Sequence, residues 1–111
     1  MDNKQIIIRL LRELVKDIVE KNYLEIQETK RIGRLDIKML EEAINDYGIL
    51  LVYPPNHIYQ EVEVYEIEDN LKYSLDFDLW DEEEVNDLTL QCEVTFYGEN
   101  AQITIDDIQV L

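Results

Sequence analysis

The sequence predicts an α+β fold, in which two N-terminal helices pack on one face of a three- to four-stranded antiparallel meander. In the N-terminal part, apolar residues recur at spacings of three and four, as is typical of helices. In the C-terminal half they alternate with polar residues, as is typical of strands with one buried face. The chain has 111 residues and is 46% hydrophobic, so we expect a single domain, residues 1–111, around one core.

The first predicted helix spans residues 4–21. Its apolar side chains form one stripe, made of Ile7, Leu10, Leu11, Leu14, Val15, Ile18 and Val19. The opposite face mixes basic and acidic residues, which is the usual composition of a helix surface in contact with water. This helix is therefore expected to cover a sheet with one face and to meet solvent with the other.

The second predicted helix begins after Asp36, a competent N-cap, and ends at Gly48, which can adopt a left-handed cap conformation. Between the two helices, residues 27–34 are polar and hold the basic cluster Lys30, Arg31 and Arg34. Because no glycine-rich segment accompanies this cluster, it indicates a loop rather than a phosphate site.

The chain then becomes extended. Residues 49–52 predict a short strand or an extended link, and Pro54 and Pro55 withhold the backbone donors that a helix or a central strand needs. Across residues 62–67 the apolar positions change parity, which predicts an edge strand or a bulge.

Three further segments predict the sheet. The first has its apolar residues at odd positions: Leu71, Tyr73, Leu75, Phe77 and Leu79. The second has them at even positions: Leu88, Leu90, Cys92, Val94 and Phe96. After a turn at residues 97–100, the last segment changes parity across Asp106 and Asp107, and a bulge there would turn both carboxylates outward.

The charge is unevenly distributed along the chain. The sequence holds 10 basic and 26 acidic residues, for a net charge of -16. Residues 1–50 contain nine basic and ten acidic residues, whereas residues 51–111 contain one basic and 16 acidic residues. Because self-repulsion does not stabilise a fold, this excess indicates either a surface for a cationic partner or a solubility device. It argues against binding to nucleic acid or to anionic membranes.

The densest acidic segment, residues 76–87, combines seven carboxylates with the only tryptophan. It lacks the glycine and the ligand spacing of an EF-hand, so we expect no dedicated metal site and no cofactor. The segment is either a solvated loop with Trp80 in the core or an acidic interface with Trp80 as its aromatic anchor. Glu61 and Glu63 are expected on the solvent-facing side of the sheet, together with Asp76 and Asp78. The predicted partner-binding residues are Asp76, Asp78, Trp80, Asp81, Glu82, Glu83, Glu84, Asp87, Glu93, Asp106 and Asp107.

Enzyme chemistry finds little support, and we expect no catalytic residues. His57, the only histidine, has the chemistry of a general base, although a lone histidine is more often a surface residue. Cys92, the only cysteine, is expected to face inward as a small hydrophobe and cannot form an internal disulfide. No signal peptide and no apolar run of ~18 residues are visible, which favours a cytoplasmic protein.

Several segments resemble a family of small, acidic, uncharacterised bacterial proteins. They are Asp46-Tyr47-Gly48, Pro54-Pro55, Asp78-Leu79-Trp80 with the following glutamates, Asp87-Leu88-Thr89-Leu90 and Ile105-Asp106-Asp107-Ile108-Gln109-Val110-Leu111. The resemblance spans residues 46–111, with a similar helical start. The chain departs from the family at Gln109, where members carry histidine, and near Val85, where members carry Gly-Arg-Ser. No role of that histidine therefore carries over.

The family is similar to the immunity proteins of contact-dependent or polymorphic toxin systems, which are cytoplasmic proteins that each neutralise one toxin domain. The resemblance implies that this chain binds a basic toxin domain, such as a nuclease, and is a monomer or a heterodimer with that toxin. Two alternatives remain open. One is a regulatory or scaffold module that binds another cationic protein, and the other is a small hydrolase that uses His57.

Overall fold

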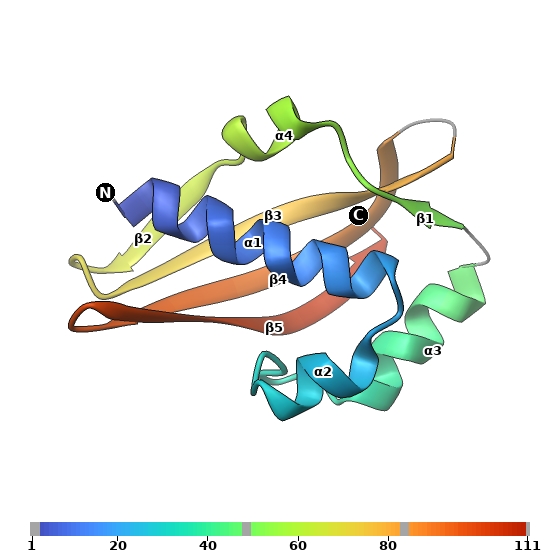
Figure 1. Cartoon of the computed structure of the whole chain (residues 1–111), viewed down its shortest axis with the longest axis horizontal. Helices are drawn as coiled ribbons and strands as arrows, with labels where there is room; N and C mark the ends of the chain where they lie inside the picture. The colour runs from blue at the N-terminus through green and yellow to red at the C-terminus, as the bar shows by residue number, and fades with distance from the viewer. Residues whose placement is uncertain (1–2, 48–49, 83–84, 111) are drawn as a thin grey trace.

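The computed structural model describes residues 3–47, 50–82 and 85–110. The elements are α1 (Asn3–Val19), α2 (Tyr23–Glu28), α3 (Ile37–Tyr47), β1 (Leu51–Val52), α4 (Asn56–Gln60), β2 (Val64–Glu68), β3 (Lys72–Asp81), β4 (Val85–Tyr97) and β5 (Asn100–Val110). Figure 1 shows α1 lying across the sheet, α2 and α3 beside β5, and α4 near the opposite edge. The predicted order of N-terminal helices followed by an antiparallel sheet is confirmed. The predicted numbers are wrong, because within these described ranges α2 and α4 are additional helices and the sheet has five strands.

α1 supplies the apolar layer that covers the sheet. Six of its side chains are no more than 3% exposed: Ile7, Ile8, Leu11, Leu14, Val15 and Ile18. They form one cluster with the inward side chains of β3, β4 and β5. Each fully buried side chain of this kind contributes roughly 1.5–3 kcal/mol. The apolar stripe predicted for this helix is thus the main contact between the helical layer and the sheet.

α3 begins as predicted. The backbone N–H of Lys38 donates a hydrogen bond of 2.7 Å to Oδ1 of Asp36, which is the side-chain contact expected of an N-cap. The predicted end of this helix at Gly48 lies outside the described residues.

The segment before α3 differs from the predicted loop. Residues 27 and 28 belong to α2, and the chain that follows pairs with β5 through backbone hydrogen bonds from Gly33 N to Ile105 O and from Ile105 N to Arg31 O. A Cβ on Gly33 would lie 3.0 Å from the backbone oxygen of Ile105 and 2.9 Å from Oδ1 of Asp106, so this close approach of two backbones favours glycine. The loop thereby covers part of the outer edge of β5.

β3 lies between β4 and two short strands. On one side β3 pairs with β4, which in turn pairs with β5, and all of these pairs are antiparallel. On its other side β3 pairs with β1 at residues 80–81 and with β2 at residues 72–75. β1 and β2 therefore share one edge of β3 and lie at opposite ends of it (Figure 1). Residues 76–79 of β3 lie between them.

The predicted irregularities in the sheet are confirmed. β2 is an edge strand with a register shift in its pairing with β3. In the β4–β5 pair, Gln91 opposes Asp107 whereas Cys92 opposes Ile105, so Asp106 is the extra residue of a bulge.

Alternation along the strands separates a covered face from an outer face. On β3 the odd-numbered side chains from Tyr73 to Leu79 are at most 9% exposed, and they face the helices. Asp76 and Asp78, at even positions, are exposed. Because the helices cover one face only, the outer face carries the polar side chains of the sheet, as the sequence predicts.

An ion pair joins α1 to the loop between α2 and α3. Nη2 of Arg31 lies 2.5 Å from Oδ2 of Asp17, and the two side chains are 12% and 18% exposed. Asn22 donates a second hydrogen bond, to Oδ1 of Asp17. Burial alone would raise the pKa of Asp17, but these hydrogen bonds and the charges of Arg31 and Lys16 outweigh burial and lower it.

Replacing Asp17 by Asn is expected to lower the free energy of unfolding at pH 7 by about 1–2 kcal/mol, because Arg31 loses its charged partner. The pKa of Asp17 is lower in the folded protein than in the unfolded chain. The stabilisation by its carboxylate is therefore present above the unfolded pKa of ~3.9 and is lost as the pH falls through the folded pKa. Urea unfolding at pH 7 and pH 3 should show the difference between Asp17→Asn and wild type shrinking at the lower pH. An equal difference at both pH values would contradict this assignment.

Candidate functional site

A groove with a volume of about 470 Å³ opens beside residues 76–80 of β3, where neither β1 nor β2 covers the strand in full. We term it the acidic groove. Its lining residues are Ile58, Glu61, Val62, Glu63, Tyr65, Asp76, Phe77, Asp78, Trp80 and Val85. Four of these are carboxylates, and none of the described residues that line the groove is Lys or Arg. The groove thus combines acidic groups with apolar and aromatic ones.

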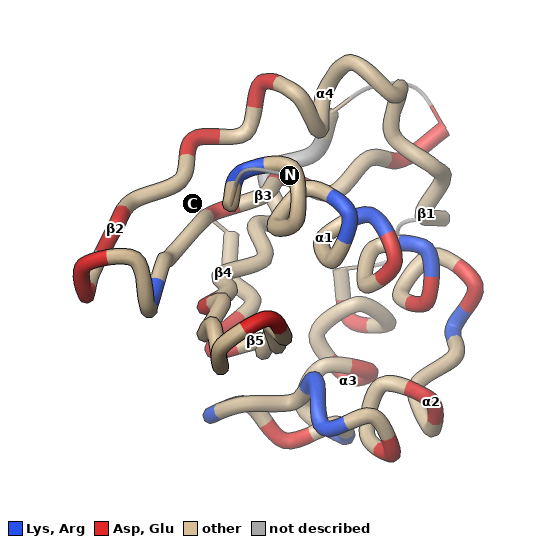
Figure 2. The backbone as a smooth tube through the Cα atoms, turned by 60° about the vertical axis from the view of Figure 1, so that its left-hand side comes forward, with Lys and Arg blue, Asp and Glu red and all other residues tan. Residues whose placement is uncertain are grey.

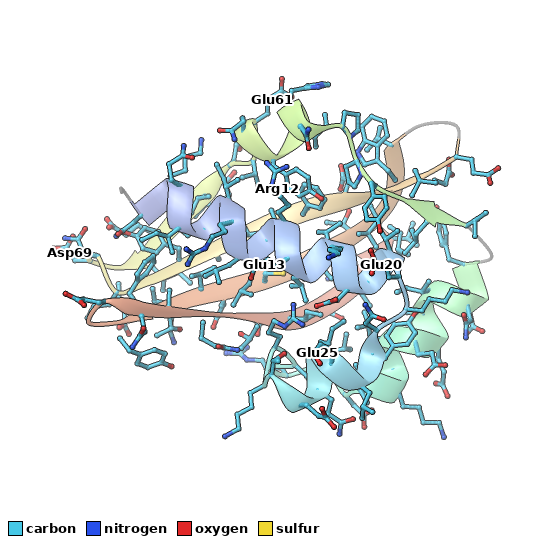
Figure 3. All side chains as sticks on the ribbon, viewed as in Figure 1. Arg12, Glu13, Glu20, Glu25, Glu61 and Asp69 are labelled. Atoms are coloured by element: carbon cyan, nitrogen blue, oxygen red, sulfur yellow. The ribbon has the colours of Figure 1, made fainter. Side chains whose placement is uncertain are left out.

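The groove is lined by residues between 58 and 65, by residues between 76 and 80 of β3 and by Val85 of β4. β3 supplies the alternating outer-face residues Asp76, Asp78 and Trp80. The facing wall comes from α4 and the chain that connects it to β2. In Figure 3, Glu61, which directly follows α4, lies on the side of that helix that is turned away from α1.

Hydrogen bonds orient the groups of the groove. Oγ1 of Thr89 donates to Oδ1 of Asp78 over 2.6 Å, and Thr89 is only 1% exposed. The hydroxyl of Tyr65 donates to Oε2 of Glu63 over 2.6 Å. This hydrogen bond, the charge of Glu63, burial and the charge of Asp76 together raise the pKa of Tyr65. The phenol is therefore a neutral donor beside two carboxylates.

Trp80 is half-buried in this groove and is neither a core residue nor a fully exposed one. Its indole Nε1 is buried and has no hydrogen-bond partner among the described residues. A buried donor without a partner costs roughly 1–3 kcal/mol, so packing alone does not favour tryptophan at this position. The side chain of Trp80 is thus partly accessible from the groove, whereas its indole N–H is not.

Carboxylates continue from the groove across the outer face of the sheet. Asp76 also lines a second hollow with Glu93 of β4 and Asp106 and Asp107 of β5. Arg34 lines the same hollow, so the chain supplies one cation of its own there. We term the four carboxylates Asp76, Glu93, Asp106 and Asp107 the sheet cluster.

Asp106 and Glu93 form a like-charged pair in this cluster. Burial, the charge of Glu93 and a hydrogen bond shared with Glu93 raise the pKa of Asp106, and the charges of Arg34 and Lys72 offset part of this increase. The negative charge of Asp106 at neutral pH therefore costs the folded state free energy.

The basic residues are concentrated in one part of the molecule, where acidic residues accompany them, whereas the acidic residues extend over the rest. Figure 2 shows acidic positions succeeding one another from the end of α4 along β2, while most basic positions lie on α1 and around α2 and α3. Lys72 is the single basic residue of residues 51–111. The acidic groove is therefore formed by the part of the chain, residues 51–111, that carries most of the net negative charge.

Most of the predicted partner-binding residues for which the structure describes a side chain lie together. Asp76, Asp78 and Trp80 line the acidic groove, and Glu93, Asp106 and Asp107 belong to the adjoining sheet cluster. Asp81, at the end of β3, is half-buried, and Glu82 after it is exposed. Glu83 and Glu84 lie outside the described residues, as does the side chain of Asp87.

Seven lining residues were absent from the predicted set: Ile58, Glu61, Val62, Glu63, Tyr65, Phe77 and Val85. Glu61 and Glu63 were expected on this face but not as partner-binding residues. Tyr65 could have been recognised as an aromatic residue within a run of glutamates. Ile58 and Val62 could not, because their position depends on α4.

The residues considered for catalysis do not assemble into a site. His57 is exposed on α4 and does not line the acidic groove. Cys92 is 2% exposed, and burial together with the charges of Asp106 and Asp76 raises the pKa of its thiol, which disfavours the nucleophilic thiolate. Within the described ranges, no group of three or more His, Cys, Asp and Glu side chains is arranged to hold a metal ion.

Among the described helices, none is both long enough and apolar enough to cross a bilayer. A family model described as Domain of unknown function (DUF7668) matches residues 15–111, which include every residue that lines the acidic groove. No curated protein and no solved structure matches the chain. Since the family description assigns no activity, the function has to be inferred from the groove.

Replacing Asp106 by Asn is expected to raise the free energy of unfolding at pH 7 by ~0.2–1 kcal/mol, because it removes a like-charged neighbour of Glu93. The pKa of Asp106 is higher in the folded protein than in the unfolded chain, so wild type loses stability relative to the variant as the pH rises between these two values. Thermal unfolding at pH 7 and pH 3 should show the variant's advantage at pH 7 only.

Asp107→Asn is the matched control for this experiment. Oδ1 of Asp107 accepts a hydrogen bond from the backbone N–H of Ile108, and Oδ2 accepts one from Gln109. This neighbouring substitution removes the same charge but weakens two hydrogen bonds, so it should not stabilise the protein. Equal stabilisation by both variants would show that general charge reduction, and not the Asp106–Glu93 pair, is responsible.

Proposed function

We propose that this chain, which belongs to the family described as Domain of unknown function (DUF7668), is a non-enzymatic protein that binds a basic partner protein at the acidic groove. The observation that supports this proposal is the lining of the groove, where four carboxylates lie beside Trp80 and Tyr65. A Lys or Arg side chain can stack on an aromatic ring while it pairs with carboxylates. The groove therefore suits a cationic side chain of a partner.

The charge of the chain and the aromatic residues of the groove would contribute differently to binding. A net charge of -16 would accelerate association with a basic partner, towards ~10⁸ M⁻¹s⁻¹ at low salt. Exposed ion pairs contribute only ~0.2–1 kcal/mol each, so they would not account for tight binding. Burial of Trp80 and a cation–π contact, which is worth roughly 0.5–2 kcal/mol, would supply more of the affinity.

Within this function, we propose that the protein is an immunity protein that neutralises a cognate basic toxin domain. The resemblance of residues 46–111 to a family similar to immunity proteins supports this role. A nuclease is the toxin class that fits best, because its cleft binds the phosphates of nucleic acid. Carboxylates of this chain placed at the same positions would compete with those phosphates. In this role the chain would act in the cytoplasm, as a monomer until the toxin binds.

The alternatives differ from this proposal in the partner or in the chemistry. A regulatory or scaffold module would use the same groove for another cationic protein, and it would be encoded away from any toxin gene. A hydrolase would require His57, for which the described part of the chain provides no ion pair with a carboxylate. The groove supports binding more directly than it supports catalysis.

The double variant Asp76→Lys/Asp78→Lys should weaken binding to the partner by at least about tenfold, because two carboxylates of the groove become cations. The measurement is calorimetric titration with the basic protein that co-purifies with wild type, together with survival of cells that produce the adjacent toxin-like gene product. Protection from the toxin should be lost while the circular dichroism spectrum stays that of wild type.

Glu28→Lys/Glu42→Lys is the matched control, because it changes the net charge equally at two exposed helical positions outside the groove. This control should bind within about twofold of wild type at moderate salt. If both double variants weaken binding to the same extent, overall charge alone drives association. If Asp76→Lys/Asp78→Lys binds like wild type, the proposed interface is wrong.

A further inference from the structure

We infer that the partner contributes a short, extended, basic segment that adds as a strand to the open edge of β3, between β1 and β2. This inference rests on the proposed function and specifies the form of the partner at the acidic groove. It is carried by the pairing of β3, by the position of α4 and by the side chains that would face an added strand.

The pairing of β3 leaves a gap of one short strand on one of its edges. β1 pairs with residues 80–81 and β2 with residues 72–75, whereas residues 76–78 pair only with β4 and Leu79 lies at a register shift in that pairing. Within the described ranges, no backbone hydrogen bond joins residues 76–79 to the chain on the side of α4. Four residues of strand span ~13 Å, which is room for three or four residues of a guest strand. Unpaired edge groups of this kind are a template for an added strand.

α4 spans this gap without filling it. The chain leaves the sheet after Val52, forms α4 and rejoins the sheet at Val64 (Figure 1). α4 is held on the covered face, where Tyr59 stacks on Phe77 with ring centroids 5.2 Å apart. On its other side, the guanidinium of Arg12 lies 4.6 Å from the centre of the Tyr59 ring, and Figure 3 shows Arg12 between α1 and α4. These contacts keep α4 toward α1, so the outer side of the gap forms the acidic groove.

The side chains around the gap specify the sequence of the guest strand. Side chains that point to the outer face would meet Asp76, Asp78 and Trp80, which suit Lys or Arg. The alternate side chains would point toward Ile58 and Val62, which suit small apolar residues such as Val. The guest is therefore a segment in which basic and apolar residues alternate, and its backbone supplies affinity as in other strand-addition complexes.

A second copy of this chain is the competing occupant. The exposed strand β2, with Tyr65 and Ile67 more than half exposed, is an edge that could pair with another copy. Each copy carries a net charge of -16, however, so this pairing would bring two strongly negative surfaces together. Charge complementarity therefore favours a basic guest.

The test uses the intact chain and three synthetic peptides. The parent peptide is acetyl-Lys-Val-Arg-Val-Lys-amide. One derivative carries N-methyl groups on the two valine amides, and the other carries them on the arginine amide and the last lysine amide. Since successive amides of a strand point to opposite edges, only one derivative blocks pairing with β3, and the other is its matched control. Titrations followed by nuclear magnetic resonance give the affinity and the amide shifts of residues 76–79.

The parent peptide should bind with cross-strand nuclear Overhauser effects to residues 76–79. One N-methylated derivative should bind roughly tenfold more weakly and the other like the parent. Equal binding of all three peptides would overturn strand addition, while loss of binding in Asp76→Lys/Asp78→Lys would still uphold the acidic groove. Binding that is insensitive to this double variant would overturn the proposed function as well. Failure of the parent to bind at millimolar concentration, or self-association of the chain through this edge, would also overturn the inference.

Discussion

The structure depends on one constraint, which is that its helices cover only one face of the sheet. The apolar stripe of α1 packs against the inward side chains of β3, β4 and β5, and these form the core. Because strand side chains alternate, burying one face directs the intervening residues to the other. In this chain those residues include Asp76, Asp78 and Glu93, so the packing that stabilises the fold also collects negative charge on one surface.

The shape of that surface follows from the connections around β3. β1 and β2 are too short to pair with β3 along its full length, and α4 occupies the chain between them. The result is a groove rather than a flat acidic sheet, with Trp80 and Tyr65 among its lining residues. A groove with aromatic walls can discriminate between partners, whereas scattered surface charge mainly affects the rate of association.

The sequence predicts the long elements of this fold well. The stripe of α1, the alternation of β3 and the parity change at Asp106 each follow from periodicity over many residues, and all three are present. α2 and α4, of six and five residues, are too short for a helical period to be recognised. The residues of the groove were therefore predicted only in part. Asp78 and Trp80 could be predicted because both lie on β3, whereas Val62 reaches the groove only because α4 precedes it. The contact between Glu93 and Asp106 likewise depends on the register across a bulge, which composition does not specify.

The central claim is that the outer surface of β3 and the acidic groove bind a basic partner. Hydrogen–deuterium exchange of the chain, alone and with its co-purifying partner, tests this claim most directly. Slower exchange should concentrate in residues 61–65 and 76–80, with little change on the solvent-facing side of α1. Protection confined to α1 or to the loop between α2 and α3, with residues 76–80 unchanged, would contradict it.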